Sequence, residues 1–422
     1  MYLLYSLLLA LSSIFLFPCY FFKKKIIRGE SLNVKARLGW GLKPLRKGDN
    51  SFWIHAVSVG EVLSLQKLVA ELKRRHSSWL INFSTLTPTG MKMAEEKLSG
   101  VDNFFYLPFD FAFALRKAYR LFSPKLLILA ESEFWPNLLK IAKERKVNVL
   151  LVNGRISERS FRRYKALRFL AKKILNNVDL FLVQTEKDKE RLEKIGVDSR
   201  KIRFAGNLKA EIELPIFSDK EVKRLKEELN IGAEEKVIIA GSTRKREEEE
   251  LLRALAETKK LRRDLKLILA PRHLDRVDEV EKMSRNLGFR VERKTKLGSP
   301  QDWDVLILDT LGELARSYAL SDMVFVGGSL VPWGGHNLLE PAFYAKPVFF
   351  GPYMKNFAFF AERFLASDAA RIVNNWKDLA LAFQDIGSKQ QQEMGKRAKS
   401  TLNSLQGATE KTIGVIEKFM ER

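Results

Sequence analysis

Short apolar runs alternate with amphipathic stretches along most of the chain. Runs of four or five apolar residues are typical of strands that are buried on both faces of a parallel sheet. Helical patterns fall between most of these runs, so the chain reads as strands separated by helices. The predicted strands are 52–56, 80–84, 126–130, 148–152 and 180–183, then 237–240, 265–269, 305–308, 323–326 and 348–350.

Two series of strands predict two doubly wound α/β domains, each Rossmann-like and built on a parallel sheet. A length of 422 residues, too long for one ordinary core, agrees with this division. The boundary is expected between 207 and 234, where Leu214-Pro215 and the charged run 220–228 interrupt the apolar rhythm. Because ligands bind beyond the carboxyl ends of the strands in such sheets, a cleft faced by both domains is the expected active site.

The N-terminus predicts a membrane anchor. Residues 1–22 carry no charge, and Lys23, Lys24, Lys25 and Arg28 follow them. About 20 apolar residues suffice to cross the hydrocarbon core, and a cleaved signal peptide would carry its positive charges before the apolar run. We expect the lysines on the cytoplasmic side, while Pro18 leaves open a helix that enters only one leaflet. The predicted parts are an anchor (1–22), a first domain (23–213) and a second domain (214–422).

Charge is distributed unevenly. The net charge of +23 comes from 39 Lys and Arg against 18 Asp and Glu in residues 1–210, and from 35 against 33 in the rest. A basic half attracts nucleic acid, anionic lipid or a phosphorylated lipid, and the alternative is a solvated basic surface. The anchor favours lipid over nucleic acid. One cysteine, Cys19, excludes an intrachain disulfide, and four histidines without metal-ligand spacing predict no structural zinc.

The segment 327–341 of the second half follows a predicted strand and leads into a predicted helix. Its glycines let backbone N–H groups approach a ligand, and a helix N-terminus offers unpaired donors with a partial positive charge. Asn337 and Glu340 lie one helical turn apart. These features favour a phosphorylated, hydroxyl-rich ligand, and the alternative is a glycine-rich turn that packs a helix onto a sheet.

Three more polar segments follow predicted strands of the same half: 241–243, 271–273 and 309–314. Arg272 can hold a phosphate or carboxylate through two parallel hydrogen bonds. Each segment alone reads as a cap or turn, but four such segments at strand ends of one sheet favour a nucleotide site. A Walker lysine motif and an early Gly-x-Gly-x-x-Gly are both missing, which argues against ATP hydrolysis and dinucleotide redox chemistry.

The first half has polar residues at strand ends too. Glu61 follows the strand 52–56 through a glycine turn and stands at a predicted helix start, where it could act as a general base or only offset the helix dipole. Glu131 directly follows the strand 126–130. Lys209, near the domain boundary, could meet a developing negative charge or be an ordinary surface lysine.

At these residues the chain resembles the Kdo transferases, the 3-deoxy-D-manno-octulosonic-acid transferases of lipopolysaccharide synthesis, which are inverting glycosyltransferases with the GT-B fold. The resemblance extends from the N-terminus to about residue 360. It departs at 242–247, which lacks a histidine and a glycine common in relatives, and 35–39 matches only loosely. The matching segments are 55–61, 87–90, 131–137, 153–157, 206–209, 271–273, 309–314 and 334–341.

The resemblance implies roles for matched positions. Glu61 corresponds to the base that deprotonates the acceptor hydroxyl, while Glu131 and Lys209 correspond to residues that stabilise the transition state. The donor CMP-Kdo belongs to the second domain and the acceptor, a lipid A precursor (lipid IVA), to the first. The implied donor-binding residues are Pro271, Arg272, Gly312, Glu313, Leu314, Asn337, Leu338, Leu339 and Glu340, with Ser242, Thr243 and Gly335 as candidate phosphate contacts.

Since the leaving group is already a phosphate monoester, helix N-termini and Arg272 could stabilise its charge, and neither a cofactor nor a metal is expected. The catalytic domains are expected on the cytoplasmic side of the inner membrane, against anionic lipids and without a nucleic-acid partner. Two alternatives remain: a nucleotide-sugar epimerase of related fold that acts on a soluble substrate, and a non-enzymatic basic protein that binds membrane or nucleic acid.

Overall fold

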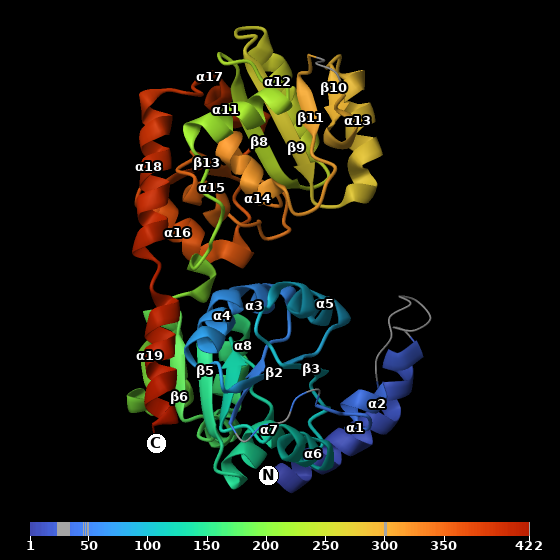
Figure 1. The fold of residues 1–422 in the computed structure, drawn as a ribbon, viewed down its shortest axis with the longest axis vertical. Coiled ribbons are helices and arrows are strands. Elements are labelled where there is room, and N and C mark those ends of the chain that lie inside the picture. Colours follow the sequence, from blue (N-terminus) through green and yellow to red (C-terminus); the bar gives the residue numbers. More distant parts are fainter. Residues whose placement is uncertain (23–33, 45, 47, 49, 299–301, 422) are drawn as a thin grey trace. The chain divides into compact units, whose positions relative to one another are not determined.

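The computed structural model describes residues 1–22, 34–44, 46, 48, 50–298 and 302–421. Lys23, Lys24, Lys25 and Arg28, the basic residues expected beside the anchor, lie outside the described residues. The chain folds into two compact units. The first unit comprises Met1–Glu211 and Leu405–Arg422, and the second comprises Ile212–Ser404 (Figure 1).

The sheet of the first unit has seven parallel strands in the order β3-β2-β1-β4-β5-β6-β7. The strand order reverses between β1 and β4, which makes their carboxyl ends the topological switch point where ligands bind in such sheets. The strands are β1 (Ser51–His55), β2 (Leu80–Thr85), β3 (Asn103–Tyr106), β4 (Leu126–Ala130), β5 (Asn148–Gly154), β6 (Leu180–Val183) and β7 (Ile202–Phe204).

Helices cover both faces of this sheet (Figure 1). They begin at residues suited to that position: the Thr87 hydroxyl accepts a hydrogen bond from the Gly90 N–H at 3.0 Å at the start of α5. The helices are α1 (Tyr2–Phe22), α2 (Val34–Arg37), α3 (Val59–Ser64), α4 (Gln66–Arg75), α5 (Pro88–Lys97), α6 (Ala112–Phe122), α7 (Pro136–Glu144), α8 (Glu158–Ala166), α9 (Arg168–Leu175), α10 (Glu186–Ile195) and α19 (Ala408–Met420), with 3-10 turns η2 (Ser199–Lys201) and η3 (Leu208–Ala210).

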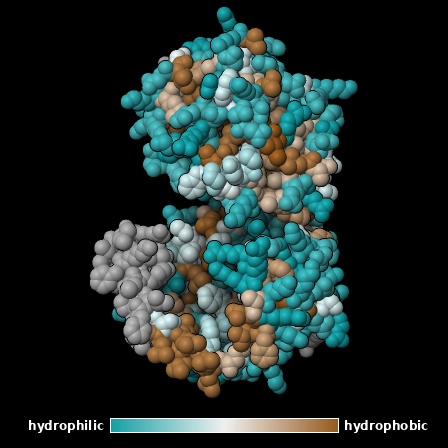
Figure 2. Space-filling model, turned by 180° about the vertical axis from the view of Figure 1, so that it is seen from behind, coloured by the Kyte–Doolittle hydropathy of each residue, from teal (hydrophilic) through white to brown (hydrophobic). Residues whose placement is uncertain are grey.

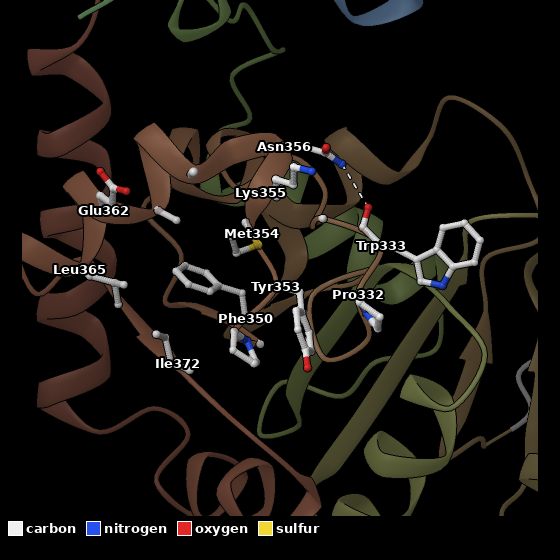
Figure 3. A pocket seen from close by; sticks show the side chains of 15 residues that line it. Pro332, Trp333, Phe350, Tyr353, Met354, Lys355, Asn356, Glu362, Leu365 and Ile372 are labelled. Atoms are coloured by element: carbon white, nitrogen blue, oxygen red, sulfur yellow. Dashed lines mark hydrogen bonds between the residues drawn. The ribbon is translucent and has the colours of Figure 1, made fainter. Parts of the chain in front are cut away.

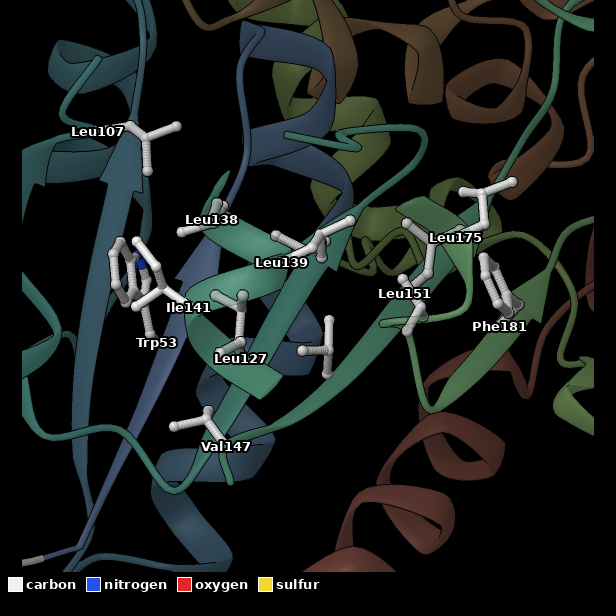
Figure 4. Close-up of a cluster of buried hydrophobic side chains, with 14 of the residues drawn as sticks. Trp53, Leu107, Leu127, Leu138, Leu139, Ile141, Val147, Leu151, Leu175 and Phe181 are labelled. Atoms are coloured by element: carbon white, nitrogen blue, oxygen red, sulfur yellow. The ribbon is translucent and has the colours of Figure 1, made fainter. Parts of the chain in front are cut away.

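Two apolar clusters form the core of the first unit, one on each face of the sheet. Successive residues of β1 enter different clusters, since Trp53 packs in one and Phe52 and Ile54 in the other. Figure 4 shows the cluster around Trp53, in which Leu138 and Ile141 of α7 pack over the sheet. Burial on both faces explains why these strands are continuous apolar runs.

The helix α19 departs from the expected domain ranges, which assigned all of 214–422 to the second domain. Its Ile413 and Ile416 are fully buried in the core cluster that contains Phe52. Arg75 of α4 also forms an ion pair of 2.7 Å with Glu410. The chain therefore returns to the first unit at its end, because the apolar face of α19 completes the cover of that sheet.

The helix α1 packs against the first unit by one face and exposes leucines on the other. The Asn137 side-chain amide donates to Ser6 Oγ at 3.0 Å, and the Asn177 amide donates to the Tyr2 hydroxyl at 2.8 Å. Figure 2 shows hydrophobic residues gathered at the end of the unit where α1 lies. Within the described part of the chain, no helix is both long and apolar enough to cross a membrane. The exposed leucines are Leu3, Leu4, Leu7, Leu8 and Leu11.

The second unit contains a parallel sheet of seven strands in the order β10-β11-β9-β8-β12-β13-β14. Its strand order reverses between β8 and β12, which is the second switch point. The strands are β8 (Lys236–Thr243), β9 (Leu265–Pro271), β10 (Val291–Arg293), β11 (Val305–Ile307), β12 (Met323–Val326), β13 (Val348–Phe350) and β14 (Ala370–Ile372).

Most helices of the second unit lie between its strands in sequence, while α11 precedes β8 and α17 and α18 follow β14 (Figure 1). At the start of α11 the Ser218 hydroxyl and the Glu221 carboxylate bond each other's backbone N–H, a capping box. The helices are α11 (Asp219–Glu228), α12 (Glu247–Lys259), α13 (Val277–Asn286), α14 (Leu314–Ser317), α15 (Leu339–Phe343), α16 (Ala358–Ala366), α17 (Trp376–Gln384) and α18 (Lys389–Ser404), with 3-10 turns η4 (Leu274–Arg276), η5 (Lys294–Lys296), η6 (Tyr318–Leu320) and η7 (Lys355–Phe357).

The prediction of two parallel α/β sheets is confirmed, and each predicted strand is present with its ends within three residues of the predicted ones. Four strands were not predicted: β3, β7, β10 and β14. All four lie at the edges of their sheets and have only three or four residues. An edge strand has one neighbour and needs no continuous apolar run, so its sequence signal is weak.

Candidate functional site

Glu61 stands in the first turn of α3, directly beyond the carboxyl end of β1. Its Oε2 accepts the Val57 N–H at 2.8 Å, and its Oε1 accepts the Ser58 hydroxyl at 2.8 Å. Burial raises the pKa of Glu61 most, and the charge of Glu131 raises it further; the Val57 and Ser58 hydrogen bonds and the charge of Lys209 lower it. The balance is a raised pKa on a carboxyl group held in a fixed orientation, which suits a proton acceptor.

Glu131 and Lys209 form an ion pair beside Glu61. Lys209 Nζ donates to Glu131 Oε1 at 2.8 Å, and both side chains are largely buried, with exposed fractions of 22% for Lys209 and 17% for Glu131. Glu131 follows β4 with a left-handed backbone, φ +53°, a conformation uncommon outside glycine and found at functional turns. Since β1 and β4 are neighbours, the switch point of the sheet brings Glu61 and Glu131 together, and Lys209 joins them from η3 through its ion pair with Glu131.

A buried amide network fixes the backbone around Lys209. The Asn207 side chain donates to Gln184 Oε1 at 2.9 Å, and Gln184 donates to the Asn153 carbonyl at 2.9 Å. Asn153 in turn accepts the Leu208 N–H at 3.0 Å. These contacts join the ends of β5 and β6 to η3, so the sheet sets the backbone position of Lys209 and the ion pair with Glu131 holds its ammonium.

Sequence reasoning overlooked Glu133, a third carboxyl group of this cluster. Burial is the largest cause that raises the pKa of Glu133, and the charge of Glu61 is the next. A hydrogen bond from Trp135 lowers the pKa, and the result is a value of about 7. The Trp135 indole N–H donates to Glu133 Oε2 at 3.0 Å. The sequence did carry a signal, because Glu133 lies two residues after Glu131 in the segment 131–137, which resembles the Kdo transferases.

In the second unit, the glycine turn after β12 binds a carboxylate of the protein itself. The N–H groups of Gly328, Ser329 and Leu330 donate to the fully buried Glu247 at 2.6, 2.9 and 2.9 Å. The Arg244 N–H donates to the same carboxylate at 2.9 Å. The expectation that these turn N–H groups face a ligand is therefore wrong, because Glu247, at the start of α12, is their acceptor.

Close packing explains one glycine of this turn. A Cβ at Gly327 would lie 2.5 Å from the Ser242 carbonyl oxygen, so only glycine lets β12 meet the end of β8. Ser242 itself has φ +56°. The candidate phosphate contacts Ser242 and Thr243 thus stand at the switch point, although Thr243 is buried.

The candidate contact Gly335 also has an internal partner, since its N–H donates to the Gly328 carbonyl at 2.7 Å. Beyond it, the Asn337 side-chain amide donates to Glu340 Oε1 at 3.0 Å, and Asn337 Oδ1 accepts the Leu339 N–H at 3.0 Å. Burial raises the pKa of Glu340, and the hydrogen bond from Asn337 lowers it by less. Leu338 and Leu339 are fully buried, so their side chains pack in the core. The expected helix is short, since α15 has five residues.

The remaining donor-binding candidates lie at the ends of β9 and beyond β11. Pro271 ends β9, and the exposed Arg272 follows, its N–H donating to the Thr243 carbonyl at 3.0 Å. Gly312 has φ +81° and stands before Glu313 and Leu314. Burial alone would raise the pKa of Glu313. The hydrogen bonds from Lys294 and Thr310 and the charges of Lys294 and Arg316 outweigh burial and lower this pKa to about 2. Glu313 is therefore ionised and held by side chains of its own unit.

A cationic cluster that sequence reasoning missed surrounds Arg272. Arg244 Nη1 lies 2.7 Å from His273 Nε2, and the Arg244 guanidinium lies 4.6 Å from the centre of the Trp333 ring. Burial, followed by the charges of Arg244, Arg272 and His273, lowers the pKa of His336 to about 4. Among the described residues, His336 Nε2 and Arg244 Nε are buried polar atoms without a hydrogen-bond partner. Such a cluster is suited to an anion.

Figure 3 shows a pocket on the other side of Trp333, with a cavity volume of about 640 Å³. Its walls come from the loop 332–334, residues 350–356 and α16. The Trp333 indole turns away from Phe350 and Met354 in this view. The predicted donor-binding residues are not part of its wall, so this pocket and the cationic cluster share only the loop.

The described part of the chain contains no group of three or more His, Cys, Asp or Glu residues arranged to hold a metal ion. Metal independence stays a prediction.

Comparison with known proteins identifies relatives. The family model described as 3-deoxy-D-manno-octulosonic-acid transferase (kdotransferase) matches residues 32–212. A 3-deoxy-D-manno-octulosonic acid transferase of Aquifex aeolicus is 33% identical over 309 residues, which cover 73% of this chain and 78% of that protein. A bifunctional glycosyltransferase/methyltransferase of Fusobacterium nucleatum is 38% identical over 351 residues, covering 81% of this chain. The chain spans about half of that relative, since the match covers 53% of its length.

Among solved structures, UDP-GlcNAc 2-epimerase from Neisseria meningitidis, bound to UDP-GlcNAc, is similar with a TM-score of 0.57. The match covers 88% of this chain and all of that one (100%), at 13% sequence identity. At this identity the likeness concerns the fold, a pair of Rossmann-like domains, and not the reaction.

Proposed function

The chain belongs to the 3-deoxy-D-manno-octulosonic-acid (Kdo) transferase family of glycosyltransferases, and on that premise we propose that it transfers Kdo from CMP-Kdo to a lipid A precursor, lipid IVA. One observation carries the proposal: a hydrogen-bonded Glu61 with a raised pKa lies beside the Glu131–Lys209 ion pair at the switch point of the first sheet. This arrangement provides a base and a paired charge where a reacting hydroxyl can be bound.

Glu61 is the proposed general base. As the acceptor oxygen attacks the anomeric carbon of Kdo, the bond from that carbon to the CMP phosphate oxygen breaks and the hydroxyl proton passes to Glu61. Attack from the face opposite the leaving group inverts the anomeric centre. The hydrogen bonds from Val57 and Ser58 hold the carboxylate in place during this transfer.

Glu131 and Lys209 are the proposed electrostatic partners. The Lys209 ammonium is fixed by its ion pair and by the buried amides around η3, so it can stabilise negative charge without reorganising during the reaction. Glu131 prevents Lys209 from pairing with Glu61, which leaves Glu61 able to accept a proton.

The donor is proposed to bind the second unit through the cluster of Arg244, Arg272, His273 and His336, in which the two arginines carry positive charge and His336, with its lowered pKa, is neutral near pH 7. The two guanidinium groups suit a nucleotide phosphate, and Asn337 with Glu340 suits hydroxyl or base edges. The proposed donor-binding residues also include Pro271, Gly312 to Leu314 and Ser242.

The membrane is the proposed location of the acceptor reaction, with the catalytic domains on the cytoplasmic side of the inner membrane. The exposed leucines of α1 form one face of a helix whose other face packs on the first unit, as in helices that lie in one leaflet. The excess of basic residues in 1–210 would attract anionic headgroups and acceptor phosphates.

The test compares Glu61→Gln with Glu186→Gln in the full chain, measuring CMP release from CMP-Kdo with lipid A precursor. Glu186 is matched because it also stands in the first turn of a first-unit helix, yet its side chain is 69% exposed. The Glu61 variant should lose about 10²–10⁴-fold in rate and the Glu186 variant should keep it. Full activity of the Glu61 variant would eliminate it as the base, and turnover without any lipid would favour the epimerase alternative.

A further inference from the structure

The first unit contains an apolar pocket that the proposed reaction leaves without a role. Its cavity volume is about 520 Å³, the size of sites that enclose drug-sized molecules. It lies between α1, α2 and the turns that follow β2, β3 and β4. Its apolar walls include Leu9, Leu38, Leu86, Leu107, Phe109 and Trp135.

The polar groups of the wall are occupied by the protein. Asp110 is 5% exposed, and its carboxylate accepts the N–H groups of Asn137 and Leu138, each at 2.9 Å. Arg37 donates to the Leu86 carbonyl and lies 5.5 Å from the centre of the Phe109 ring. The surface that remains for a guest is therefore mainly hydrocarbon, which disfavours a sugar or a phosphate.

One indole separates this pocket from the carboxyl cluster. Trp135 forms part of the pocket wall, and its N–H donates to Glu133 at 3.0 Å. Glu133 in turn is close enough to Glu61 and Glu131 for their charges to affect it. A guest with an apolar chain in the pocket would thus have its polar end near the base.

The helix α1 forms the opposite wall. Leu9 faces the pocket, whereas Leu3, Leu7 and Leu11 on the other face of the helix are exposed. With α1 lying in one leaflet, as proposed above, its outer face would contact lipid tails and its inner face would bound a space next to the hydrocarbon layer. A long-chain guest could enter there without crossing water.

We propose that this pocket binds one acyl chain of the glycolipid acceptor. The proposal rests on the proposed function and adds a binding site to it. The occupant follows from three observations: an apolar lining, a wall shared with the carboxyl cluster through Trp135, and a second wall made by the leucine-rich α1. Holding one chain would place the acceptor sugar beside Glu61, so the pocket selects acylated acceptors.

The experiment fills the pocket in the full chain, with Leu9→Trp and Leu38→Trp as two variants from different walls. Leu11→Trp is the matched control, because Leu11 lies on the same helix but is exposed. Kdo transfer is measured in detergent micelles with acylated lipid A precursor and with its deacylated sugar phosphate. Both pocket variants should lose about tenfold or more in kcat/KM on the acylated acceptor, the effect of losing contact with about two methylene groups.

The outcomes separate the inference from the proposed function. Unchanged rates on the deacylated acceptor, with the loss confined to the acylated one, support the acyl site. Equal losses on both acceptors, or losses in the Leu11 variant as well, overturn it. The inference is also overturned if the pocket variants transfer Kdo at the normal rate but bind phospholipid vesicles more weakly than the wild type, because the pocket would then hold a membrane lipid. If the wild type transfers Kdo to neither acceptor, the proposed function itself is wrong.

A binding readout independent of turnover uses Trp135 as the reporter. A dibrominated fatty acid quenches tryptophan fluorescence at contact, so the wild type should show a quenched component that Trp135→Phe lacks. Leu9→Trp should compete with this binding. Identical quenching in the wild type and in Trp135→Phe would overturn the proposed site.

Discussion

Replacing Glu247 by glutamine should loosen the glycine turn of the second unit. Each carboxylate oxygen accepts two backbone N–H groups: Oε1 those of Ser329 and Leu330, and Oε2 those of Gly328 and Arg244. Glutamine keeps one acceptor oxygen and places an NH₂ group at the other position. Whichever way the amide is turned, two buried N–H groups then face a donor.

The magnitude follows from those two lost acceptors. A buried donor without a partner costs about 1–3 kcal/mol, so the substitution should cost roughly 2–6 kcal/mol in the local stability of the turn. Glu249 is the matched control, because it stands in the same first turn of α12 but is exposed. Its change to glutamine should stay within about 0.5 kcal/mol.

Hydrogen exchange of the full chain, read by mass spectrometry on peptides covering 327–335, measures this directly. A cost of about 2 kcal/mol corresponds to about 30-fold faster exchange when the turn opens locally. Glu247→Gln should reach at least that ratio to the wild type, and Glu249→Gln should match the wild type. Equal exchange in all three proteins would refute the role assigned to Glu247.

Three further predictions concern the two candidate sites. The pKa of Glu133 is raised from 4.5 to about 7 in the folded protein, so Glu133 loses its proton at lower pH in the unfolded chain, and the free energy of unfolding falls as pH rises from about 4.5 to about 7. Glu133→Gln should remove this fall, which amounts to up to about 3 kcal/mol when urea unfolding is measured between pH 5 and 8. The same pH dependence of the unfolding free energy in both proteins would contradict the prediction. Lys209→Met leaves the buried Glu131 without its ion pair and should lower the transfer rate by about 10²–10³-fold. Lys209→Arg should retain more of the transfer rate than Lys209→Met. Equal transfer rates of Lys209→Met and the wild type would exclude an electrostatic role of Lys209. Arg244→Ala should raise the pKa of His336 above its value of about 4 in an NMR titration and weaken CMP binding about tenfold or more. An unmoved titration would show that the charge of Arg244 does not hold this pKa low.

The elements that the sequence predicted are those whose burial dictates composition. The strands β1 and β4 are buried along their whole length, so their apolar runs were readable. The edge strand β10 buries only Val291 of its three residues and left no such pattern. The place of α19 was not predictable either, because an amphipathic helix shows that it packs but not against which sheet.

In the candidate site, too, some features could be predicted from the sequence and others could not. The glycine turn and the strand ends could be located, since each follows an apolar run. The partner of the turn could not be located, because Glu247 lies 81 to 83 residues before the N–H groups of the turn that it accepts. In the sequence it is one of four acids at a helix start. Arg244 likewise gains its role from His273 and Trp333, which only the folded sheet brings to it.

Mass spectrometry of the lipid product shows whether Glu61 enables the transfer of Kdo to a lipid acceptor. Lipid A precursor is incubated with CMP-Kdo and either the wild type or Glu61→Ala, and the mass of the lipid is then measured. We expect the wild type to add one or more Kdo units and the variant to leave the lipid unchanged. A lipid of unaltered mass after incubation with the wild type, or equal products from both proteins, would contradict this expectation.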